Sequence, residues 1–514
     1  MIYFTLLTTP DYIHGAKLSG SYDFSHRQRE VVTVIRTFAL GLSVVFGTVL
    51  ALPAFAGNFN YIAPGPASSV GAISNSEIST SGRYNPSATF GSTKFSRFPL
   101  LDFTGNVQTR GLGEFNTVFE DMGDRLDSID ATFTAFEDGD ATVGDVLGEI
   151  NDLESALDTN IALLADNFYA KPGAMVHMPF TPLDLNFQET GTFSFGVSSL
   201  TQGRISLLHD EIEFDVDAQA ITDANDNDED LEPTDFLRTT SSIYLKQAQV
   251  FNLDLGYARQ LPPITFLDNF GVSATAGARG TLIAHSLQKR LYPLKSLIQD
   301  ADSGDDSLQQ TIQDDLTSAY NNYNYDVALD LGVTLTRDNT QLGFTLYNVN
   351  RPVMEYNVLG GACGDLTDDT EQTECFHAEH FASLGDMSLA EEHRVYPHLG
   401  IEASQSWLNN RLVLASSLDV TQKTDLFGEE SQTMNLAFLA QPTQWYWPRL
   451  RLGVGKDFTD LEATQLGFGL SFFKVFQLDS SLNADLGDLF SDDLTEQGNA
   501  LRSASASASF NIAF

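Results

Sequence analysis

The sequence predicts an all-β transmembrane barrel of about 14 antiparallel strands, with an N-terminal plug-like segment and an α-helical hairpin. Three observations predict this fold. From residue 175 onward, segments of about ten residues alternate between apolar and polar side chains. The polar face of these segments is rich in Gly, Ser, Asn and Asp, which suits a water-filled lumen. The chain ends in a segment of this kind, and its last residue is Phe514.

The alternation is clearest in residues 325–335 and 476–486, and it recurs in 251–257 and 466–472. In the first segment, one face carries Tyr325, Val327, Leu329, Leu331, Val333 and Leu335. Its other face carries Asp326, Ala328, Asp330, Gly332 and Thr334. A soluble β-sandwich also alternates. Aromatic residues near segment ends (Tyr257, Tyr347 and 445–447) favour the barrel, because such residues form girdles at membrane interfaces.

The C-terminal segment places Phe510, Ile512 and Phe514 on one face and a run of serines on the other. A terminal Phe that closes an alternating strand resembles the signal read by the bacterial barrel-assembly machinery, which is therefore an expected partner. Inside a bilayer every backbone polar group needs a hydrogen-bond partner, so the sheet must close. An even number of strands puts both ends of the barrel's chain, its N-terminus and its C-terminus, in the periplasm.

A leader precedes the mature chain. Arg27, Arg29 and Arg36 are followed by an uncharged run, and Ala54 and Ala56 form a small-x-small site before Gly57. This order of basic, apolar and cleavage regions is typical of a secretory signal peptide, and an uncleaved N-terminal anchor is the alternative. Export and the barrel together predict the outer membrane of a Gram-negative bacterium, with its lipid and lipopolysaccharide as surroundings.

Three regions are expected: an extension with signal peptide (1–56), a plug-like segment with a helical hairpin (57–172), and the barrel (173–514). Residues 57–101 are rich in Gly, Ser, Asn and Pro and lack a long period. Residues 114–167 have apolar positions three and four apart, with a break at 137–140. They predict two amphipathic helices packed on each other or on the barrel mouth, and a partner-binding coiled coil is the alternative.

The formal charge is −41, from 69 acidic and 28 basic side chains. Phosphate backbones are bound by Lys and Arg, so this excess argues against nucleic-acid binding. Soluble loops or a saline habitat account for it. The chain has two cysteines, Cys363 and Cys375, and in an exported protein such a pair predicts a disulfide. Their spacing does not match a thioredoxin-type redox site.

Acidic side chains on the polar faces are the candidate functional residues of the lumen. They are Asp254, Asp326, Asp330, Asp419, Asp479 and Asp485. Arg279, Arg449, Arg451 and Lys423 are expected to face inward with them. Two interpretations remain open. The acids pair with these cations as lumen packing, or they make the lumen prefer cations.

Other candidates are weaker. His377, His380, His393 and His398 fall in one stretch, but their spacing matches no metal motif, so a surface loop is expected. The acidic run 223–230 lacks the glycine and terminal glutamate of a calcium loop. Long inserts at 217–235, 291–324 and 360–395 are expected to be extracellular. No catalytic motif is present, so we expect neither an enzyme nor a metal or other cofactor.

Several segments resemble the plasmid-transfer TraF-like outer-membrane proteins, which are related to the FadL-type channels. Asn85-Pro86-Ser87-Ala88 is similar to their N-terminal turn, and residues 147–164 to their helical segment. Residues 330–349, 412–426 and 451–489 are similar to their strands. The resemblance implies an outer-membrane barrel with a plug-like segment, linked to conjugative transfer or envelope assembly. The alternative is a FadL-like channel for a small hydrophobic ligand, with a lateral gap into the bilayer.

Overall fold

The computed structural model describes residues 66–71, 73, 84–90, 98–111, 140–187, 190–216, 237–296, 323–442, 446–473, 475–485 and 500–512, with isolated positions at 118–136 and 444. The proposed leader with Ala54 and Ala56, the acidic run 223–230 and the terminal Phe514 lie outside these residues. None of the described helices is long and apolar enough to cross a membrane.

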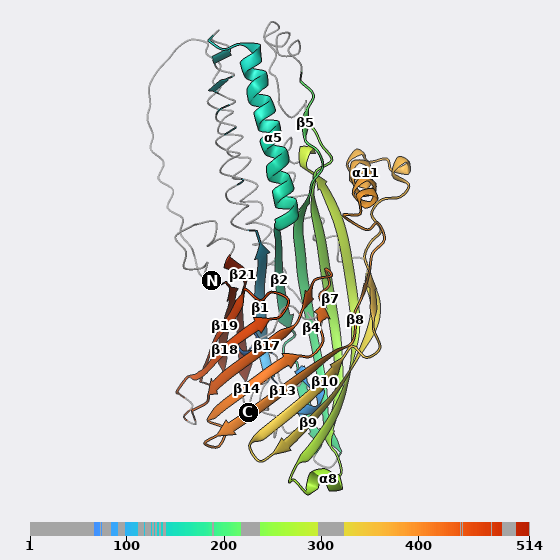
Figure 1. The fold of residues 1–514 in the computed structure, drawn as a ribbon. Helices are drawn as coiled ribbons and strands as arrows, with labels where there is room; N and C mark the ends of the chain where they lie inside the picture. Colours follow the sequence, from blue (N-terminus) through green and yellow to red (C-terminus); the bar gives the residue numbers. More distant parts are fainter. Residues whose placement is uncertain are drawn as a thin grey trace, which may run out of the picture.

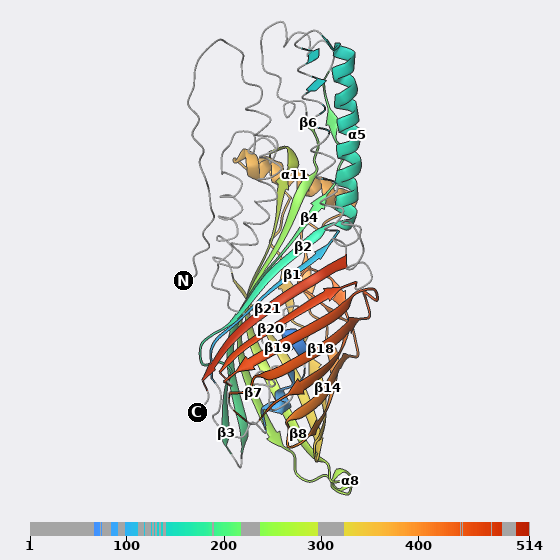
Figure 2. The ribbon, with the colours of Figure 1, turned by 90° about the vertical axis from the view of Figure 1, so that its left-hand side faces the viewer.

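The described strands form one closed antiparallel ring, in which each strand pairs with the next along the chain and the last pairs with the first (Figures 1 and 2). The ring confirms the prediction of about 14 strands. Its members are β1 (Phe98–Arg110), β2 (Tyr169–His177), β4 (Gly191–Leu208), β7 (Ser242–Gln260), β8 (Ser273–Pro293), β9 (Asn324–Arg337), β10 (Thr340–Tyr347), β13 (His398–Trp407), β14 (Leu412–Asp419), β17 (Thr433–Ala440), β18 (Arg449–Asp457), β19 (Thr464–Phe472), β20 (Phe476–Ala484) and β21 (Leu501–Ile512).

One position in the ring is shared by two segments. β2 pairs with the upper part of β4, and the short strand β3 (Leu183–Phe187) pairs with the lower part of β4. The first residues of β1, before Asp102, pair with β21 only. In the described residues the hydrogen-bonded ladder is therefore interrupted between β1 and β3 (Figure 2).

Side chains alternate across the wall as the sequence predicts. On β9, Val327 is 50% exposed and its neighbour Ala328 only 4%. Large apolar side chains are exposed on the outside of most strands, as a lipid-facing band requires. Aromatic residues are exposed near one end of this band, including Phe193, Trp407 and Tyr446. Tyr347 was expected in the girdle, but it points into the lumen, where its ring stacks on His398.

The two ends of the barrel differ. Short turns and the small helix α8 (Thr265–Asp268) lie at one end, which we call the turn side, with the ends of β1 and β21 that lead to the termini (Figure 1). The opposite loop side carries α5 (Val143–Asn167), η3 (Cys363–Asp365) and α11 (Asp369–Leu384). It also carries the small pairs β5 (Glu213–Phe214) with β6 (Leu237–Arg238), β11 (Val353–Glu355) with β12 (Glu392–Arg394), and β15 (Lys423–Thr424) with β16 (Glu430–Ser431).

The strands are also of unequal length. β4, β7 and β8 have 18, 19 and 21 residues, whereas β17, β18 and β19 have 8, 9 and 9. A strand needs about 9–11 residues to cross a bilayer. The three long strands therefore continue past the lipid-facing band on the loop side (Figure 1). Their upper outer faces are covered there by Val118, Leu164 and Phe168.

The barrel begins earlier than the sequence indicated. Because β1 and β2 both belong to the ring, the boundary expected between residues 172 and 173 falls inside β2. The helical region is consequently an insertion between the first two strands, not a separate N-terminal unit. Its second helix is α5, which begins with a capping box between Thr142 and Asp145. Most of the expected first helix lies outside the described residues.

Candidate functional site: the barrel lumen and its loop-side mouth

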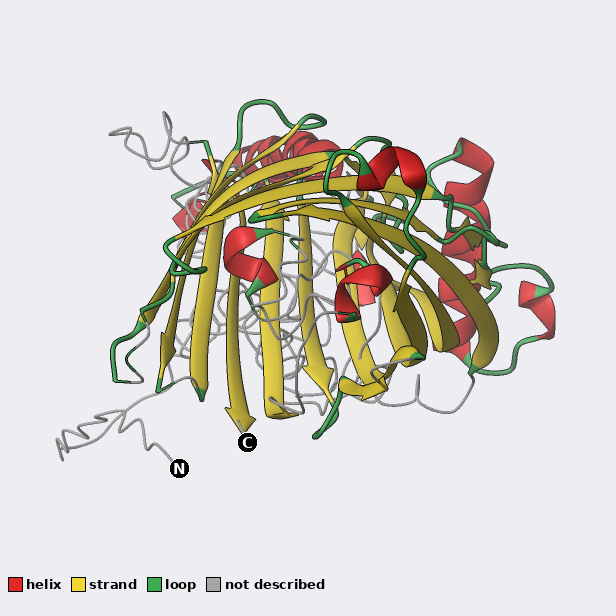
Figure 3. Ribbon diagram, turned by 90° about the horizontal axis from the view of Figure 1, so that it is seen from below, coloured by secondary structure: helices red, strands yellow, loops and turns green. Residues whose placement is uncertain are grey.

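Part of the N-terminal segment lies inside the ring of strands, so that short helices are visible within the barrel when it is viewed from below (Figure 3). We call residues 66–71, 73 and 84–90, which are the described part of this segment, the plug segment. One piece is α2 (Ala67–Val70), which packs on β17, β18, β19, β20 and β21. The other is η1 (Pro86–Thr89), which packs on β7, β8 and β9. These two walls are nearly opposite each other in the ring, so the plug segment contacts two opposite sides of the lumen.

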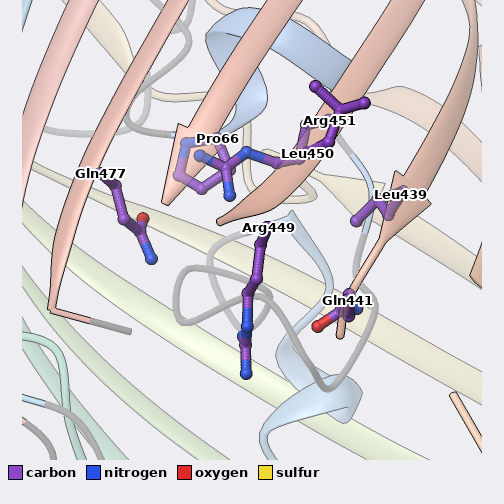
Figure 4. A pocket seen from close by; sticks show the side chains of 7 residues that line it. All are labelled: Pro66, Leu439, Gln441, Arg449, Leu450, Arg451 and Gln477. Atoms are coloured by element: carbon purple, nitrogen blue, oxygen red, sulfur yellow. The ribbon is translucent and has the colours of Figure 1, made fainter. Parts of the chain in front are cut away.

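Glycines in β18 and β19 make room for α2. The backbone oxygen of Ser69 lies so close that a Cβ atom on Gly453 or Gly467 would be only 2.0 or 1.8 Å from it. The Ser69 hydroxyl donates a hydrogen bond to Asp479, and Arg451 donates two to the same carboxylate, each of 2.8 Å. Figure 4 shows Pro66, which precedes α2, among the side chains of β18 and β20 that line a small cavity.

The opposite wall holds η1 in a similar way. The Asn85 side-chain oxygen accepts from the Ser87 amide at 3.0 Å, and its Nδ2 donates to Glu402 at 3.1 Å. A Cβ atom on Gly277 or Gly332 would lie 2.6 Å from the backbone of Pro86 or 2.1 Å from Asn85. The turn that carried the family resemblance is thus a built-in contact between the plug segment and the wall.

Ion pairs account for several of the predicted lumen acids. Arg279 donates to Asp330 from Nε at 3.0 Å and from Nη2 at 2.6 Å, and both side chains are buried. Asp479 pairs with Arg451, as described above. Lys423 donates to Asp419 at 2.8 Å. The contact between Arg451 and Asp479 uses both carboxylate oxygens, and such a bidentate contact fixes side-chain geometry as well as charge.

The remaining acids have other surroundings. Asp254 accepts from Thr281 at 2.6 Å. Asp326 is 3.9 Å from the ring of His285, and Asp485 lies just beyond the end of β20. The arrangement matches lumen packing for the three ion-paired acids, Asp330, Asp419 and Asp479, and supplies no separate argument for cation selectivity.

On the loop side, two loops fold back into the mouth. Met354, Tyr356 and Val395 come from the loop between β10 and β13, and Leu426 and Phe427 from the loop between β14 and β17. We call these five residues the loop closure. They pack on apolar wall residues of β2, β4, β7, β8 and β9, which are Met175, Leu200, Ala248, Val250, Ile283, Leu287 and Ala328. The loop-side part of the lumen therefore contains a cluster of apolar side chains where the sequence predicted a polar, water-filled interior.

Directly above this apolar layer, the wall carries four basic residues at one level. Lys246 is opposite Arg204 on β4 and opposite Lys289 on β8. On β2, Ala170 is opposite Ile205 of β4, so the next residue, Lys171, is level with Arg204. We call Lys171, Arg204, Lys246 and Lys289 the cation row. Sequence reasoning missed it, because only the strand register brings residues so far apart in the chain into line.

Acidic residues of the two loops contact the cation row. Lys171 donates to Asp425 at 2.8 Å and also contacts Glu429, which lies 3.1 Å from Arg204. Glu391 is 2.6 Å from Lys246 and 4.0 Å from Lys289. Lys171 and Arg204 lie over the face of the Tyr169 ring, and Lys246 and Lys289 lie over the face of the Tyr356 ring. These contacts add cation–π attraction.

A cavity of about 460 Å³ opens beside the cation row, below the C-terminal end of α5. Arg110, Arg204 and Lys246 line it together with Asp166, Asp386 and Glu429. Tyr169, Tyr244 and Phe168 supply aromatic surface. Its volume lies within the range of about 300–1,000 Å³ that is common for small-molecule sites.

The cysteines and histidines stabilise the loop side. The structure joins Cys363 to Cys375, whose Cα atoms are 5.5 Å apart, and so ties η3 to α11. His377 is 2.9 Å from the Ser242 hydroxyl, and His380 is 3.3 Å from Asp210. Burial lowers the pKa of His377 and of His393. The four histidines therefore contact different partners, and His398 lies in the lumen.

Among the described residues, Cys363, Cys375 and Glu379 are close enough together to share a metal ion. Both sulfur atoms are in the disulfide, so they cannot act as thiolate ligands. This cluster does not fit a metal.

A family model described as "F plasmid transfer operon, TraF, protein" matches residues 83–419. The match runs from the plug-segment turn to the end of β14 and includes Met354, Tyr356 and Val395 of the loop closure. The chain belongs to this family. No curated protein sequence matches this TraF family member.

Three solved structures are similar to this TraF family chain. A mutant of the TodX monoaromatic hydrocarbon channel is 11% identical, with a TM-score of 0.38 over 88% of this chain and 98% of its own. The Ralstonia pickettii toluene transporter TbuX is 10% identical, with a TM-score of 0.39 over 89% and 99%. The CymD monoaromatic hydrocarbon channel is 9% identical, with a TM-score of 0.37 over 89% and 99%.

Proposed function

We propose that this TraF family protein is an outer-membrane barrel that passes small solutes when its plug segment and loop closure move aside. The lipid-facing apolar band and the closed ring support the membrane location. In cell fractions, the protein should co-purify with lipopolysaccharide. Unheated samples should migrate differently from boiled ones on a gel, and recovery in aqueous fractions would contradict the location.

The plug segment carries the proposal of a gated lumen. It contacts both walls through hydrogen bonds and backbone contacts on glycines, and Val70 and Ile73 add a small apolar cluster with β14 and β17. This apolar cluster is smaller than that of the loop closure, and hydrogen bonds can be exchanged for water at little net cost. We therefore infer that the plug segment is the part of the closure that leaves first.

Removal of residues 57–96 tests this gate, because the deletion stops before β1 and spares the ring. In planar bilayers we expect larger and more frequent conductance steps than for the full mature chain. Liposome swelling with sugars gives an independent readout. Identical conductance with and without the segment would reject the gate.

The lateral interruption between β1 and β3 favours the second candidate, a channel for small hydrophobic compounds. An unpaired strand edge in a bilayer is costly unless something covers it. A solute that leaves through this gap would enter the lipid directly. Uptake of an apolar dye into liposomes, without uptake of sugars, would favour this route over an axial one.

The printed family description also motivates a role in conjugative transfer, through the loop side. α5 projects from this side (Figure 1), and all of its charged side chains are acidic, including Asp145, Glu149 and Asp152. Replacing residues 112–166 with a short glycine-serine linker should then lower mating frequency while the heat-dependent gel shift persists. Unchanged mating would remove this role and leave the gated lumen untouched.

A further inference from the structure

The cation row is unusual because like charges directly opposite each other on neighbouring strands are destabilising. Adjacent strands are about 4.8 Å apart, so four charges in line span about 14 Å. The whole chain has only 28 basic residues against 69 acidic ones, yet four of the basic residues meet here. The wall therefore presents concentrated positive charge inside the mouth of an otherwise acidic protein.

The balancing charges belong to loops and not to the strands of the wall. In the described ion pairs of the row, the partners are Asp425 and Glu429 on one loop and Glu391 on another. Four cations face three carboxylates. Movement of either loop out of the mouth leaves the wall with uncompensated positive charge.

The adjoining cavity provides space for a ligand at this level. Three basic and three acidic residues line it while the loops are in place. Departure of Glu429 with its loop removes one of the three acids and frees Arg204 from its partner at 3.1 Å. The guanidinium of Arg204 and the ammonium of Lys246 then face a space with aromatic surface on two sides.

We propose that the cation row is a binding site for small solutes with two or more phosphate or carboxylate groups. In the closed structure, Asp425, Glu429 and Glu391 take the places of the anionic groups of the ligand. Binding exchanges these loop carboxylates for those of the solute and opens the mouth. This inference rests on the proposed passage of solutes for its purpose, but binding itself requires no transport.

A purely structural interpretation makes a different prediction. If the row only fastens the loops, the loop acids are its permanent partners and no variant binds added anions. If the loop acids compete with a ligand, their tethering gives them a high effective concentration, so binding to the wild type is weak. Removal of a competing carboxylate must then strengthen binding.

Isothermal titration calorimetry of the mature protein in detergent micelles, with inorganic tripolyphosphate as probe, separates the two. We expect Glu429→Gln to bind at least about tenfold more tightly than the wild type, and Lys246→Met at least about tenfold more weakly. Lys246→Arg keeps the charge and should bind like the wild type. Lys456→Met, on β18 and distant from the row, is the matched control for net charge.

Equal affinity of Glu429→Gln and wild type would overturn the proposal, as would a loss in Lys456→Met equal to that in Lys246→Met. The heat-dependent gel shift establishes that each variant is folded. Citrate in place of tripolyphosphate tests carboxylates, and lipopolysaccharide micelles test whether the phosphates come from lipid. A barrel that binds tripolyphosphate but shows no conductance would contradict the gated channel and leave this site intact.

Discussion

The two closures of the lumen differ in how they are held. The loop closure is an apolar cluster in which Phe427 and Tyr356 are almost fully buried against the wall. The plug segment has a smaller apolar cluster, in which Val70 and Ile73 pack on β14 and β17, and it otherwise lies on glycines and hydrogen-bonds to wall side chains through Ser69 and Asn85. Burial of apolar surface contributes roughly 25 cal/mol per Å², whereas a single hydrogen bond adds only about 1 kcal/mol net. The loop closure should therefore be the more stable of the two.

Phe427→Ala should produce the largest effect, because it leaves a cavity in the loop closure. We expect the free energy of unfolding to fall by about 3–5 kcal/mol in urea titrations of micellar protein. Phe438→Ala, whose ring faces lipid, is the matched control and should cost less. Equal losses for the two variants would mean that the loop closure is not a packed core.

Asp479→Asn should come next, because it leaves the buried Arg451 guanidinium without its charged partner. Breaking such a pair costs about 3 kcal/mol. The same change weakens the contact with Ser69, so a thiol reagent should label Ser69→Cys faster. That cysteine is the only free thiol, because the native pair is in the disulfide. Asp254→Asn should leave the labelling rate unchanged.

Gly277→Val tests the plug segment alone. The new side chain would overlap the backbone of Pro86, and relief of such overpacking is worth about 1–3 kcal/mol. Displacement of η1 should increase conductance while the barrel stays folded. Gly280→Val lies three residues away in the same strand with open space around it, so it should conduct like the wild type.

The smallest expected effect depends on pH. Burial holds the pKa of His377 and His393 below the ordinary value of 6.5, so docking of their loop favours the neutral rings. This stabilisation is complete above pH 6.5 and is lost as the pH falls toward the lower folded pKa. His377 faces Ser242, Thr240, His380 and Asp210; His393 faces Asp425, Glu391 and Lys246.

Limited proteolysis of residues 349–397 should therefore be faster at pH 5 than at pH 7.5. Replacing both histidines with Gln should remove most of the difference. A difference that persists in this double variant would assign the pH dependence to other groups, such as the carboxylates of the cation row.

Much of the wall could be predicted from the sequence. The alternation of apolar and polar residues indicates which side chains face lipid, because the opposite assignment would place charged side chains in hydrocarbon. The same alternation correctly placed Arg279, Arg451 and Lys423 near the inward acids. The expectation of an aromatic girdle misplaced Tyr347, because aromatic residues near strand ends occur on both faces and the Tyr347 ring stacks on His398 in the lumen.

Contacts between distant parts of the chain could not be predicted. Residues 98–110 were expected to belong to the plug-like region 57–172, but they form a barrel strand whose partners on β21 are some 400 residues away. To predict the cation row, the registers of four strands must be known. To predict the loop closure, the paths of two loops must be known. These depend on long-range pairing that local patterns do not encode.

The unequal strands shape the mouth of the barrel. Beyond a bilayer-spanning length, β7 and β8 continue for about ten residues, or on the order of 30 Å along the strand direction. On the other side, β17–β19 stop near the membrane surface. A molecule that diffuses along the membrane surface therefore meets a high barrel wall on the side of β7 and β8 and a low wall on the side of β17–β19. Solutes and partner proteins would accordingly approach the opening from the sector of the short strands.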